Sequence, residues 1–249
     1  MSALNAAEAV IFDMDGVLTD SEWFIAEAAR LMFKETHGVT VTHGDFLPFV
    51  GLGENRFLGG VAEKHGVAGF DIDRDKARTY EIYGDLVKGK LKPLPGAVEF
   101  VRQCRALGCK TALATSTDYI KMMASLTEIG LIKQPPSAAE VGLAVAIAAA
   151  AANNAFDALV NGLDVERRKP FPDIFLEAAR RVGAAPEHCW VVEDSVGGIA
   201  AAKAAGMRCL ALLTTFPETE IRAAGADIVA RDLSSISPEA LLNFPPENT

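Results

Sequence analysis

The sequence predicts an α/β protein, in which helices cover both faces of a parallel β-sheet and one helical segment is inserted into the chain. Short apolar, β-branched runs alternate with segments whose apolar residues recur at helical spacing, and this alternation is typical of a parallel sheet. It is interrupted once, between the first run and the second, which indicates the insertion. The expected strands are Ala9–Phe12, Thr111–Ala114, Ala158–Val160, Cys189–Val192, Cys209–Leu213 and Ile228–Val229.

Four helices are expected between these strands, and a glycine follows each of them. Glycine readily adopts the left-handed conformation in which many helices end, so its position supports the predicted C-termini. The helices are Val98–Leu107, Tyr119–Ile129, Pro172–Val182 and Val196–Ala205, followed by Gly108, Gly130, Gly183 and Gly206.

The inserted segment, 21–91, contains no convincing buried strand and favours helices. It ends in Lys90–Gly96, a stiff linker that contains proline. We therefore expect residues 21–91 to form a helical cap over the carboxyl ends of the strands, and residues 1–20 and 92–249 to form the core. The helices expected within the cap are Trp23–Glu35, Glu54–His65 and Asp73–Val87.

A second unusual segment, 135–154, is rich in alanine. Because alanine is the best helix former, we expect an additional helix over Ala138–Ala152. We expect this helix to carry no functional site.

Composition excludes several classes of protein. Half of the 249 residues are hydrophobic, and the formal net charge is −9 without a basic patch, so we expect no nucleic-acid partner. The longest uncharged apolar stretch, Val141–Ala152, is shorter than the roughly 20 residues that a membrane-spanning helix needs, and we recognise no signal peptide. The four cysteines form no C-x-x-C pair and are expected to be buried free thiols, which suits a reducing compartment. We expect a soluble monomer.

Two aspartates, Asp13 and Asp15, directly follow the first expected strand, and Gly16 comes next. Side chains two residues apart on an extended chain point to the same side. Like charges held this close repel, unless a cation, a proton or a reaction compensates for them. Because open α/β sheets bind ligands at the carboxyl ends of their strands, the pair indicates a ligand site. The alternative is an ordinary turn, in which Asp and Gly are also common.

Three further strand or loop ends carry polar groups. Thr115-Ser116-Thr117 stands before a helix and offers an anion site, Lys169 precedes a helix that begins with proline, and Glu193-Asp194 follows the fourth strand. Each group alone has an ordinary interpretation: a helix cap, a solvated charge, or acids that favour a helix dipole. Together they place several carboxylates at one edge of the sheet. That arrangement predicts Mg²⁺, which prefers a few hard oxygen ligands together with substrate phosphate.

These motifs resemble those of the haloacid dehalogenase-like superfamily of phosphohydrolases, and the resemblance covers nearly the whole chain. The most specific part is the combination of Asp13-x-Asp15-Gly16-Val17 with Glu193-Asp194. The resemblance implies a Rossmann-like core with an inserted helical cap. The segments Lys169–Phe175 and Val192–Met207 are similar to the branch that contains phosphoglycolate phosphatase and β-phosphoglucomutase.

The resemblance also implies a mechanism. Asp13 would attack phosphorus and form an aspartyl-phosphate, while Asp15 would protonate the leaving oxygen and later take a proton from water. Thr115 and Lys169 would hold the phosphoryl group of a small phosphorylated metabolite. Gly16 and Ser116 would add phosphate contacts.

A Mg²⁺ ion would be held by four residues in this implied site. Asp13 and Asp194 would contribute carboxylates, Asp15 its backbone carbonyl, and Glu193 a carboxylate directly or through water.

The leaving group of the substrate would contact the cap. The candidate residues are Ser21, Glu54, Asn55 and Arg56, whereas Trp23 and Phe24 are expected to pack in the cap core.

Three alternatives remain open. Dehalogenases of the superfamily lack the second aspartate and the late metal acid, both present here as Asp15 and Asp194. Mutases use a histidine and a cap arginine where this chain has Ile25 and Glu54, although Arg56 lies nearby. A regulatory or docking domain of a larger protein is the third alternative.

A narrower resemblance supports that third alternative. The cap segment Phe49–Ala62 and the run Gly206-Met207-Arg208-Cys209 are similar to the hydrolase domain of a chloroplast thylakoid protein. We therefore expect this chain in the cytoplasm or in the chloroplast stroma.

Overall fold

The computed structural model describes residues 7–49, 53–133 and 155–244. The helix expected over Ala138–Ala152 lies outside these residues, as do Val50 and Gly51 of the cap segment that carries the narrower resemblance. Among the described residues, no helix is long and apolar enough to cross a membrane. All four cysteines are free and buried, as predicted.

A six-stranded parallel sheet forms the core, in the order β3-β2-β1-β4-β5-β6. All six predicted strands are therefore confirmed. Because β1 pairs with β2 on one side and with β4 on the other, the direction of strand order reverses at β1. This reversal opens a crevice at the carboxyl ends of these strands, where ligands of such sheets bind. The strands are β1 (Ala9–Phe12), β2 (Lys110–Ala114), β3 (Ala158–Val160), β4 (Cys189–Glu193), β5 (Arg208–Leu212) and β6 (Ile228–Ala230).

The first strand shows how the sheet is buried on both faces. Alternate side chains of a strand point to opposite faces, so Val10 and Phe12 enter one apolar cluster while Ala9 and Ile11 enter the other. The Phe12 ring makes edge-to-face contact with Phe100 at a centroid distance of 6.2 Å. A continuous apolar run therefore forms a central strand that is buried on both faces.

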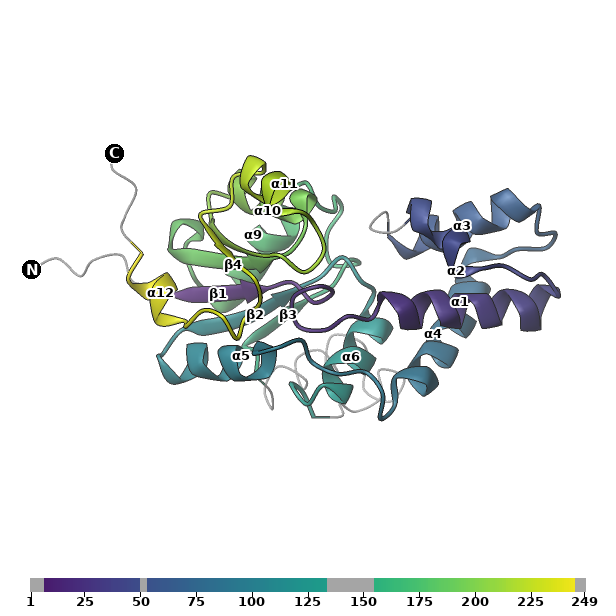
Figure 1. Ribbon diagram of the computed structural model, residues 1–249, viewed down its shortest axis with the longest axis horizontal. Helices are drawn as coiled ribbons and strands as arrows, with labels where there is room; N and C mark the ends of the chain where they lie inside the picture. Colours follow the sequence, from purple (N-terminus) through teal and green to yellow (C-terminus); the bar gives the residue numbers. More distant parts are fainter. Residues whose placement is uncertain (1–6, 50–52, 134–154, 245–249) are drawn as a thin grey trace, which may run out of the picture.

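Helices cover both faces of the sheet, as predicted (Figure 1). The apolar residues of α5 and α6 pack in one cluster, and those of α9, α10 and α11 pack in the other. The glycine predicted to end each of the four expected helices has a positive φ. The bounds are α5 (Ala97–Ala106), α6 (Tyr119–Glu128), α9 (Asp173–Val182), α10 (Val196–Ala204), α11 (Glu218–Ala223) and α12 (Glu239–Leu242), with a short 3-10 helix η2 (Pro186–His188).

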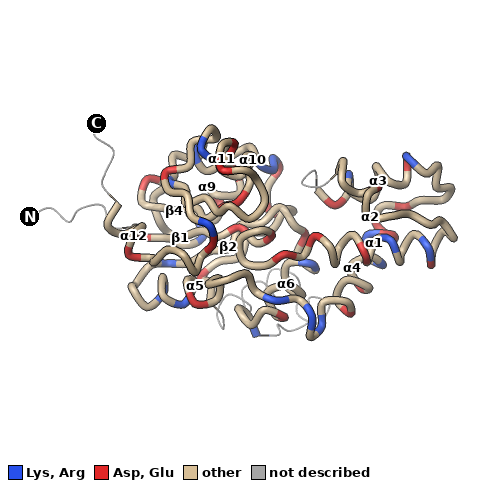
Figure 2. The backbone as a smooth tube through the Cα atoms, viewed as in Figure 1, with Lys and Arg blue, Asp and Glu red and all other residues tan. Residues whose placement is uncertain are grey.

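The inserted segment is helical and lies beyond the carboxyl ends of the strands (Figure 1). Its three expected helices are present, and sequence periodicity missed a short fourth one because four residues are too few to show it. Charged residues of both signs are distributed over this helical group and over the core (Figure 2). The elements are α1 (Glu22–His37), α2 (His43–Phe46), α3 (Glu54–His65) and α4 (Ile72–Val87), with a 3-10 helix η1 (Leu47–Phe49).

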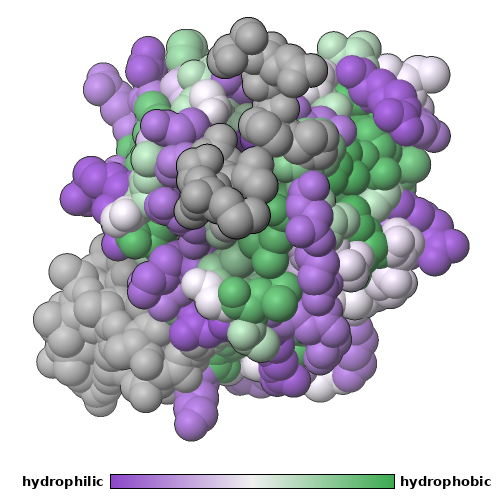
Figure 3. Space-filling model, turned by 90° about the vertical axis from the view of Figure 1, so that its left-hand side faces the viewer, coloured by the Kyte–Doolittle hydropathy of each residue, from purple (hydrophilic) through white to green (hydrophobic). Residues whose placement is uncertain are grey.

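Two polar contacts join α4 to the core segment around α6. The Tyr83 hydroxyl hydrogen-bonds the Ser125 hydroxyl at 2.7 Å, and Lys76 pairs with Asp118 at 2.9 Å. These contacts hold the helical group against one side of the core. At the opposite end of the molecule, around α12, hydrophobic side chains lie in patches between hydrophilic ones (Figures 1 and 3).

Candidate active site

A cleft of about 640 Å³ opens where the carboxyl ends of the central strands face the helical group. Residues that follow β1, β2, β4 and β5 line it from the core, and residues of α1 and α3 line it from the other side. The lining includes Asp13, Asp15, Gly16, Asp20, Glu22, Glu54, Thr115, Ser116, Thr117, Lys121, Lys169, Glu193, Asp194, Thr214 and Thr215.

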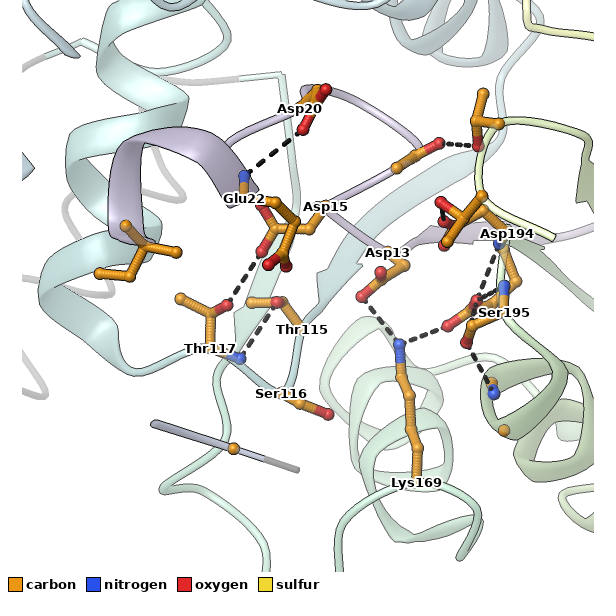
Figure 4. A pocket seen from close by; sticks show the side chains of 18 of the residues that line it. Asp13, Asp15, Asp20, Glu22, Thr115, Ser116, Thr117, Lys169, Asp194 and Ser195 are labelled. Carbon is orange, nitrogen blue, oxygen red and sulfur yellow. Dashed lines mark hydrogen bonds and ion pairs between the residues drawn. The ribbon is translucent and has the colours of Figure 1, made fainter. Parts of the chain in front are cut away.

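A lysine bridges two carboxylates at the centre of the cleft. The Lys169 ammonium donates to Asp13 Oδ1 at 2.7 Å and to Glu193 Oε1 at 2.5 Å (Figure 4). Asp13 is held in place because it directly follows β1 and its backbone N–H donates to the Val192 carbonyl. Burial lowers the pKa of Lys169, but the Asp13 and Glu193 carboxylates outweigh this effect and raise it overall, so the lysine is charged.

Glu193 is fixed by its own backbone surroundings. Its second carboxylate oxygen accepts hydrogen bonds from the backbone N–H groups of Asp194 and Ser195 and from the Ser195 hydroxyl. A Cβ at position 198 would lie 1.9 Å from this carboxylate, so Gly198 is required for the approach of α10. Although burial opposes it, Lys169 together with these donors lowers the pKa of Glu193.

Asp194 completes a group of three carboxylates. Oxygens of Asp13, Glu193 and Asp194 all lie within 4.8 Å of one another, and Asp194 also accepts a hydrogen bond from the Thr215 hydroxyl. Burial, and then the neighbouring acids, raise the pKa of Asp194 to about 8. Burial raises the pKa of Asp13 to about 7, although Lys169 opposes the shift. One lysine does not compensate for three buried carboxylates, so these residues fit a divalent cation that takes oxygen ligands.

The glycine of the first motif has a steric role in this group. A Cβ at Gly16 would lie 1.9 Å from an Asp194 carboxylate oxygen, and its φ of 78° is unfavourable for other residues. Any side chain at this position would therefore displace Asp194.

Asp15 lines the same cleft but makes different contacts. Its carboxylate accepts a hydrogen bond from the Thr117 hydroxyl at 3.1 Å (Figure 4). It also accepts from the Ser21 hydroxyl and from the Lys121 ammonium, the latter at 2.9 Å. Burial raises its pKa, but Lys121 and the hydroxyl donors outweigh this effect and lower it overall. The side chain of Asp15 is not part of the carboxylate group around Asp194, so any metal contact of this residue would be through its backbone.

The loop after β2 lies beside Asp15. Thr115 is buried, and its hydroxyl oxygen accepts a hydrogen bond from the Thr117 backbone N–H at 3.2 Å. Ser116 lines the cleft in front of α6. The structure therefore brings Thr115 and Ser116 to the sheet edge that carries Asp13, as the motif spacing predicts.

The structure separates the residues that we expected to contact the leaving group. Glu54 lines the cleft, whereas Asn55 accepts from Lys76, and the exposed Arg56 pairs with Glu63. Ser21 is fully buried, and its hydroxyl is engaged by Asp15. Successive helical residues point about 100° apart, so Glu54 faces the cleft while its neighbours do not.

One expectation for the cap core is wrong. Phe24 packs partly buried against the core cluster, as expected, but Trp23 is 54% exposed and contacts Phe24 and His43 at the surface. Helical periodicity indicates which face of a helix is apolar but not how far neighbouring elements cover that face. Trp23 lies where α1 is no longer covered.

Sequence reasoning also missed several cleft residues, among them Lys121, Thr214 and Thr215. Lys121 stands in the first turn of α6, where a positive charge opposes the helix dipole, and this unfavourable position was a usable signal. Thr214 and Thr215 follow β5, so they could have been predicted as site residues by their position after a strand, as Asp13 and Asp194 were.

Comparisons with known proteins agree with this geometry. A model of the haloacid dehalogenase-like hydrolase family matches residues 7–206. The chain is 34% identical over 203 residues to a phosphorylated carbohydrates phosphatase of Thermotoga maritima, covering 80% of this chain and 82% of that protein. The structure of CbbY from Rhodobacter sphaeroides in complex with phosphate superposes with a TM-score of 0.76 at 24% identity, covering 96% of this chain and 100% of that one, which shows the shared fold.

A further relative accounts for the narrower resemblance. The chain is 41% identical over 246 residues to suppressor of quenching 1, a chloroplastic protein of Arabidopsis thaliana. The match covers 97% of this chain but only 21% of that protein, so the chain spans about a fifth of its length. With the family match over most of the chain, the motifs at the strand ends and the parallel sheet, this chain belongs to the haloacid dehalogenase-like hydrolases.

Proposed function

We propose that this protein is a Mg²⁺-dependent phosphatase that hydrolyses a small phosphomonoester through an aspartyl-phosphate on Asp13. The observation that carries the proposal is the centre of the cleft, where Lys169 bridges Asp13 and Glu193 beside Asp194. Family membership and the similarity to a phosphatase support it.

The carboxylate group supports the choice of metal. Asp13, Glu193 and Asp194 offer the hard oxygen ligands that Mg²⁺ prefers, and we add the backbone carbonyl of Asp15 as a fourth ligand. When bound, Mg²⁺ would offset charge on the phosphoryl oxygens. The raised pKa values of Asp13 and Asp194 are consistent with a site that gains from a further cation.

Asp13 is the proposed nucleophile. One of its carboxylate oxygens attacks phosphorus, and the bond from phosphorus to the leaving oxygen breaks. Lys169, held 2.7 Å from Asp13, orients this carboxylate, and with Thr115, Ser116 and Gly16 it holds the phosphoryl group.

Asp15 is the proposed acid and base. From the minor protonated form that its lowered pKa leaves at neutral pH, it donates a proton to the leaving oxygen in the first step, and it takes a proton from water in the second. That water attacks phosphorus, which releases inorganic phosphate and restores Asp13.

We further propose that residues 21–91 form a cap that selects the leaving group, over a core of residues 1–20 and 92–249. Glu22 and Glu54 line the cleft from α1 and α3, and the two lysines that line it already pair with carboxylates. A second anionic group would therefore be repelled, which supports a substrate with one phosphate on a neutral leaving group.

The same charges disfavour the sugar-phosphate mutase alternative, which requires a doubly phosphorylated intermediate. Arg56, the candidate substitute for a phosphate-binding arginine of the cap, pairs with Glu63 and lies over the Phe49 ring. Conversion of β-glucose 1-phosphate to its 6-phosphate, with a trace of the bisphosphate, would support the mutase instead.

A docking role remains the second candidate, and the relation to a much longer chloroplastic protein favours it. On this proposal the chain acts in the chloroplast stroma as one part of a larger protein, alongside its catalytic role. Tracing a fluorescent fusion of the full-length protein to another compartment would contradict the placement.

The test of the proposed function compares Asp13→Asn with Asp85→Asn. We expect Mg²⁺-dependent release of phosphate from p-nitrophenyl phosphate by the unaltered protein and its near-complete loss in Asp13→Asn. Asp85 is exposed, and its ion pair among the described residues is with Lys88 at the C-terminal end of α4, so its variant controls for the change in charge. Turnover by Asp13→Asn at the unaltered rate would overturn the proposal.

A further inference from the structure

A buried lysine outside the family motifs faces the cleft. Lys121 is the third residue of α6, and only 4% of its side chain is exposed. Burial disfavours its positive charge, and so does the nearby N-terminus of the helix. A lysine in this position needs compensation by negative charge.

The compensation comes from Asp15. The Lys121 ammonium lies 2.9 Å from Asp15 Oδ2, and it also lies in the field of Glu22 and Glu54. These carboxylates raise the pKa of Lys121 despite its burial, so the lysine stays charged. The pair joins residues 106 positions apart in the chain.

Three donors together restrict the Asp15 carboxylate. Ser21 donates to one of its oxygens, and Thr117 and Lys121 both donate to the other. Contacts to both oxygens restrict the rotation of the carboxylate group. Lys121 is the charged one of the three donors. The carboxylate is thereby held between Asp13 and the Glu22 side of the cleft (Figure 4).

The backbone around Lys121 links this arrangement to α4. The Lys121 carbonyl accepts a hydrogen bond from the Ser125 hydroxyl at 2.8 Å, and Ser125 in turn contacts the Tyr83 hydroxyl of α4. The first turn of α6 is therefore anchored by the helical group that covers the cleft.

We propose that Lys121 is a positioning residue, which together with Thr117 holds the Asp15 carboxylate in the place where it transfers a proton to the leaving group. The inference rests on the proposed phosphatase function. On this proposal Lys121 does not touch the phosphoryl group and acts only through Asp15.

The proposal predicts a selective effect on substrates. A poor leaving group needs a proton when its bond to phosphorus breaks, whereas p-nitrophenolate leaves without one. General acid catalysis contributes typically 10²–10⁴-fold, so a misplaced acid slows alkyl phosphates far more than aryl phosphates. A merely structural role of Lys121 would slow both substrates alike.

The experiment measures kcat/KM with Mg²⁺ for β-glycerol phosphate and for p-nitrophenyl phosphate. In Lys121→Met we expect the value for β-glycerol phosphate to fall at least about ten-fold more than that for p-nitrophenyl phosphate. Lys121→Arg retains the cation and should recover part of the difference. In an Asp15→Asn background, Lys121→Met should add no further selectivity.

Two more variants keep the test decisive. Thr117→Val removes a second donor without disturbing charge, and it should give a smaller selective loss even if Lys121→Met does not fold. Lys203→Met breaks the ion pair with Asp227, which lies outside the cleft lining, and should leave the ratio of the two substrates unchanged.

Equal losses on both substrates in Lys121→Met and Thr117→Val would overturn the positioning role alone. Additional selectivity in the Asp15→Asn background would do the same, because Lys121 would then act by another route. Absence of Mg²⁺-dependent hydrolysis of both substrates by the unaltered protein would overturn the proposed function and this inference with it.

Discussion

Two lysines line one cleft and stand in different electrostatic situations. Lys169 bridges Asp13 and Glu193, and Asp194 adds a third carboxylate that no lysine of the described ranges contacts directly. Within the described residues, Lys121 forms its ion pair with Asp15, and Glu22 and Glu54 lie in its field. The pKa values of Asp13 and Asp194 are raised around Lys169, whereas Lys121 and the hydroxyl donors lower the pKa of Asp15, although Glu22 and Glu54 add negative charge nearby.

The difference separates two kinds of chemistry. Carboxylates in excess gain from a divalent cation, whereas a carboxylate with its own ammonium partner does not need one. We infer that the first cluster is where metal and phosphate bind, and that the second controls a proton. Four predictions test this contrast, beginning with the largest expected effect.

Removing the lysine of the first cluster should have the largest effect. In Lys169→Met we expect kcat/KM for p-nitrophenyl phosphate to fall by about 10²–10³, because a preorganised positive charge beside the phosphoryl group is lost. The free energy of unfolding should also fall by about 3–5 kcal/mol at neutral pH, because the fully buried Glu193 loses its partner. Steady-state kinetics and urea unfolding measure the two losses. Near-normal activity in this variant would remove the distinction between the two lysines.

The pH dependence of stability should reveal the excess carboxylates in protein freed of metal. For Asp13 and Asp194, pKa values of about 7 and about 8 lie above the unfolded value of 3.8, so the folded state binds more protons between these limits. The free energy of unfolding therefore falls as pH rises from about 4 to about 8, by an amount on the order of a few kcal/mol.

Asp15 contributes with the opposite sign. Its lowered pKa adds stability above pH 3.8 that is lost as the pH falls below it. Urea unfolding at several pH values, with a chelator present to remove metal, measures the sum of the two effects. Repeating it with Asp194→Asn isolates the contribution of Asp194. A stability that rises steadily from pH 5 to pH 8 would contradict the excess of charge at the first cluster.

Mg²⁺ should stabilise the protein through the first cluster only. At a concentration about 100 times its Kd, a bound ion adds about 2.7 kcal/mol, which corresponds to a rise in Tm of roughly 5–10 °C for a chain of this size. Thermal melts with and without Mg²⁺ should show this rise in the unaltered protein and in Lys121→Met, and its loss in Asp194→Asn. Loss of the rise in Lys121→Met would mean that the two clusters do not act separately.

The smallest effect concerns the contact that anchors the second cluster. Tyr83→Phe removes the hydrogen bond to Ser125 and should lower the free energy of unfolding by about 1 kcal/mol. Tyr119→Phe is the matched control, because that buried hydroxyl has no hydrogen-bond partner within the described part of the chain. Equal losses in the two variants by urea unfolding would show that the Tyr83 contact contributes nothing specific.

Much of the fold and of the first cluster could be predicted because their signals are local. An apolar run such as Ala9–Phe12 marks a strand buried on both faces, and the polar residue after it marks the edge of the sheet. In a parallel sheet these edges coincide, so Asp13, Lys169 and Asp194 could be placed together without knowledge of any contact.

The second cluster could not be predicted in the same way. A lysine near the start of a helix is ordinarily solvated, whereas Lys121 is buried against the loop after β1 in a helix that also contacts α4. Periodicity defines a helical face but not what covers it. For this reason the sequence did not predict that Trp23 is exposed, or that Glu54 lines the cleft while Asn55 and Arg56 point elsewhere.

By itself, the sequence determined the parallel sheet, the strand ends that carry function and the family, because each depends on burial pattern and local order. Only the tertiary structure decided which lysine pairs with which carboxylate. The pairs Lys169–Asp13 and Lys121–Asp15 join residues 156 and 106 positions apart. Charge compensation depends on distances of a few ångströms between such segments, and these distances are set only when the layers and the cap pack together.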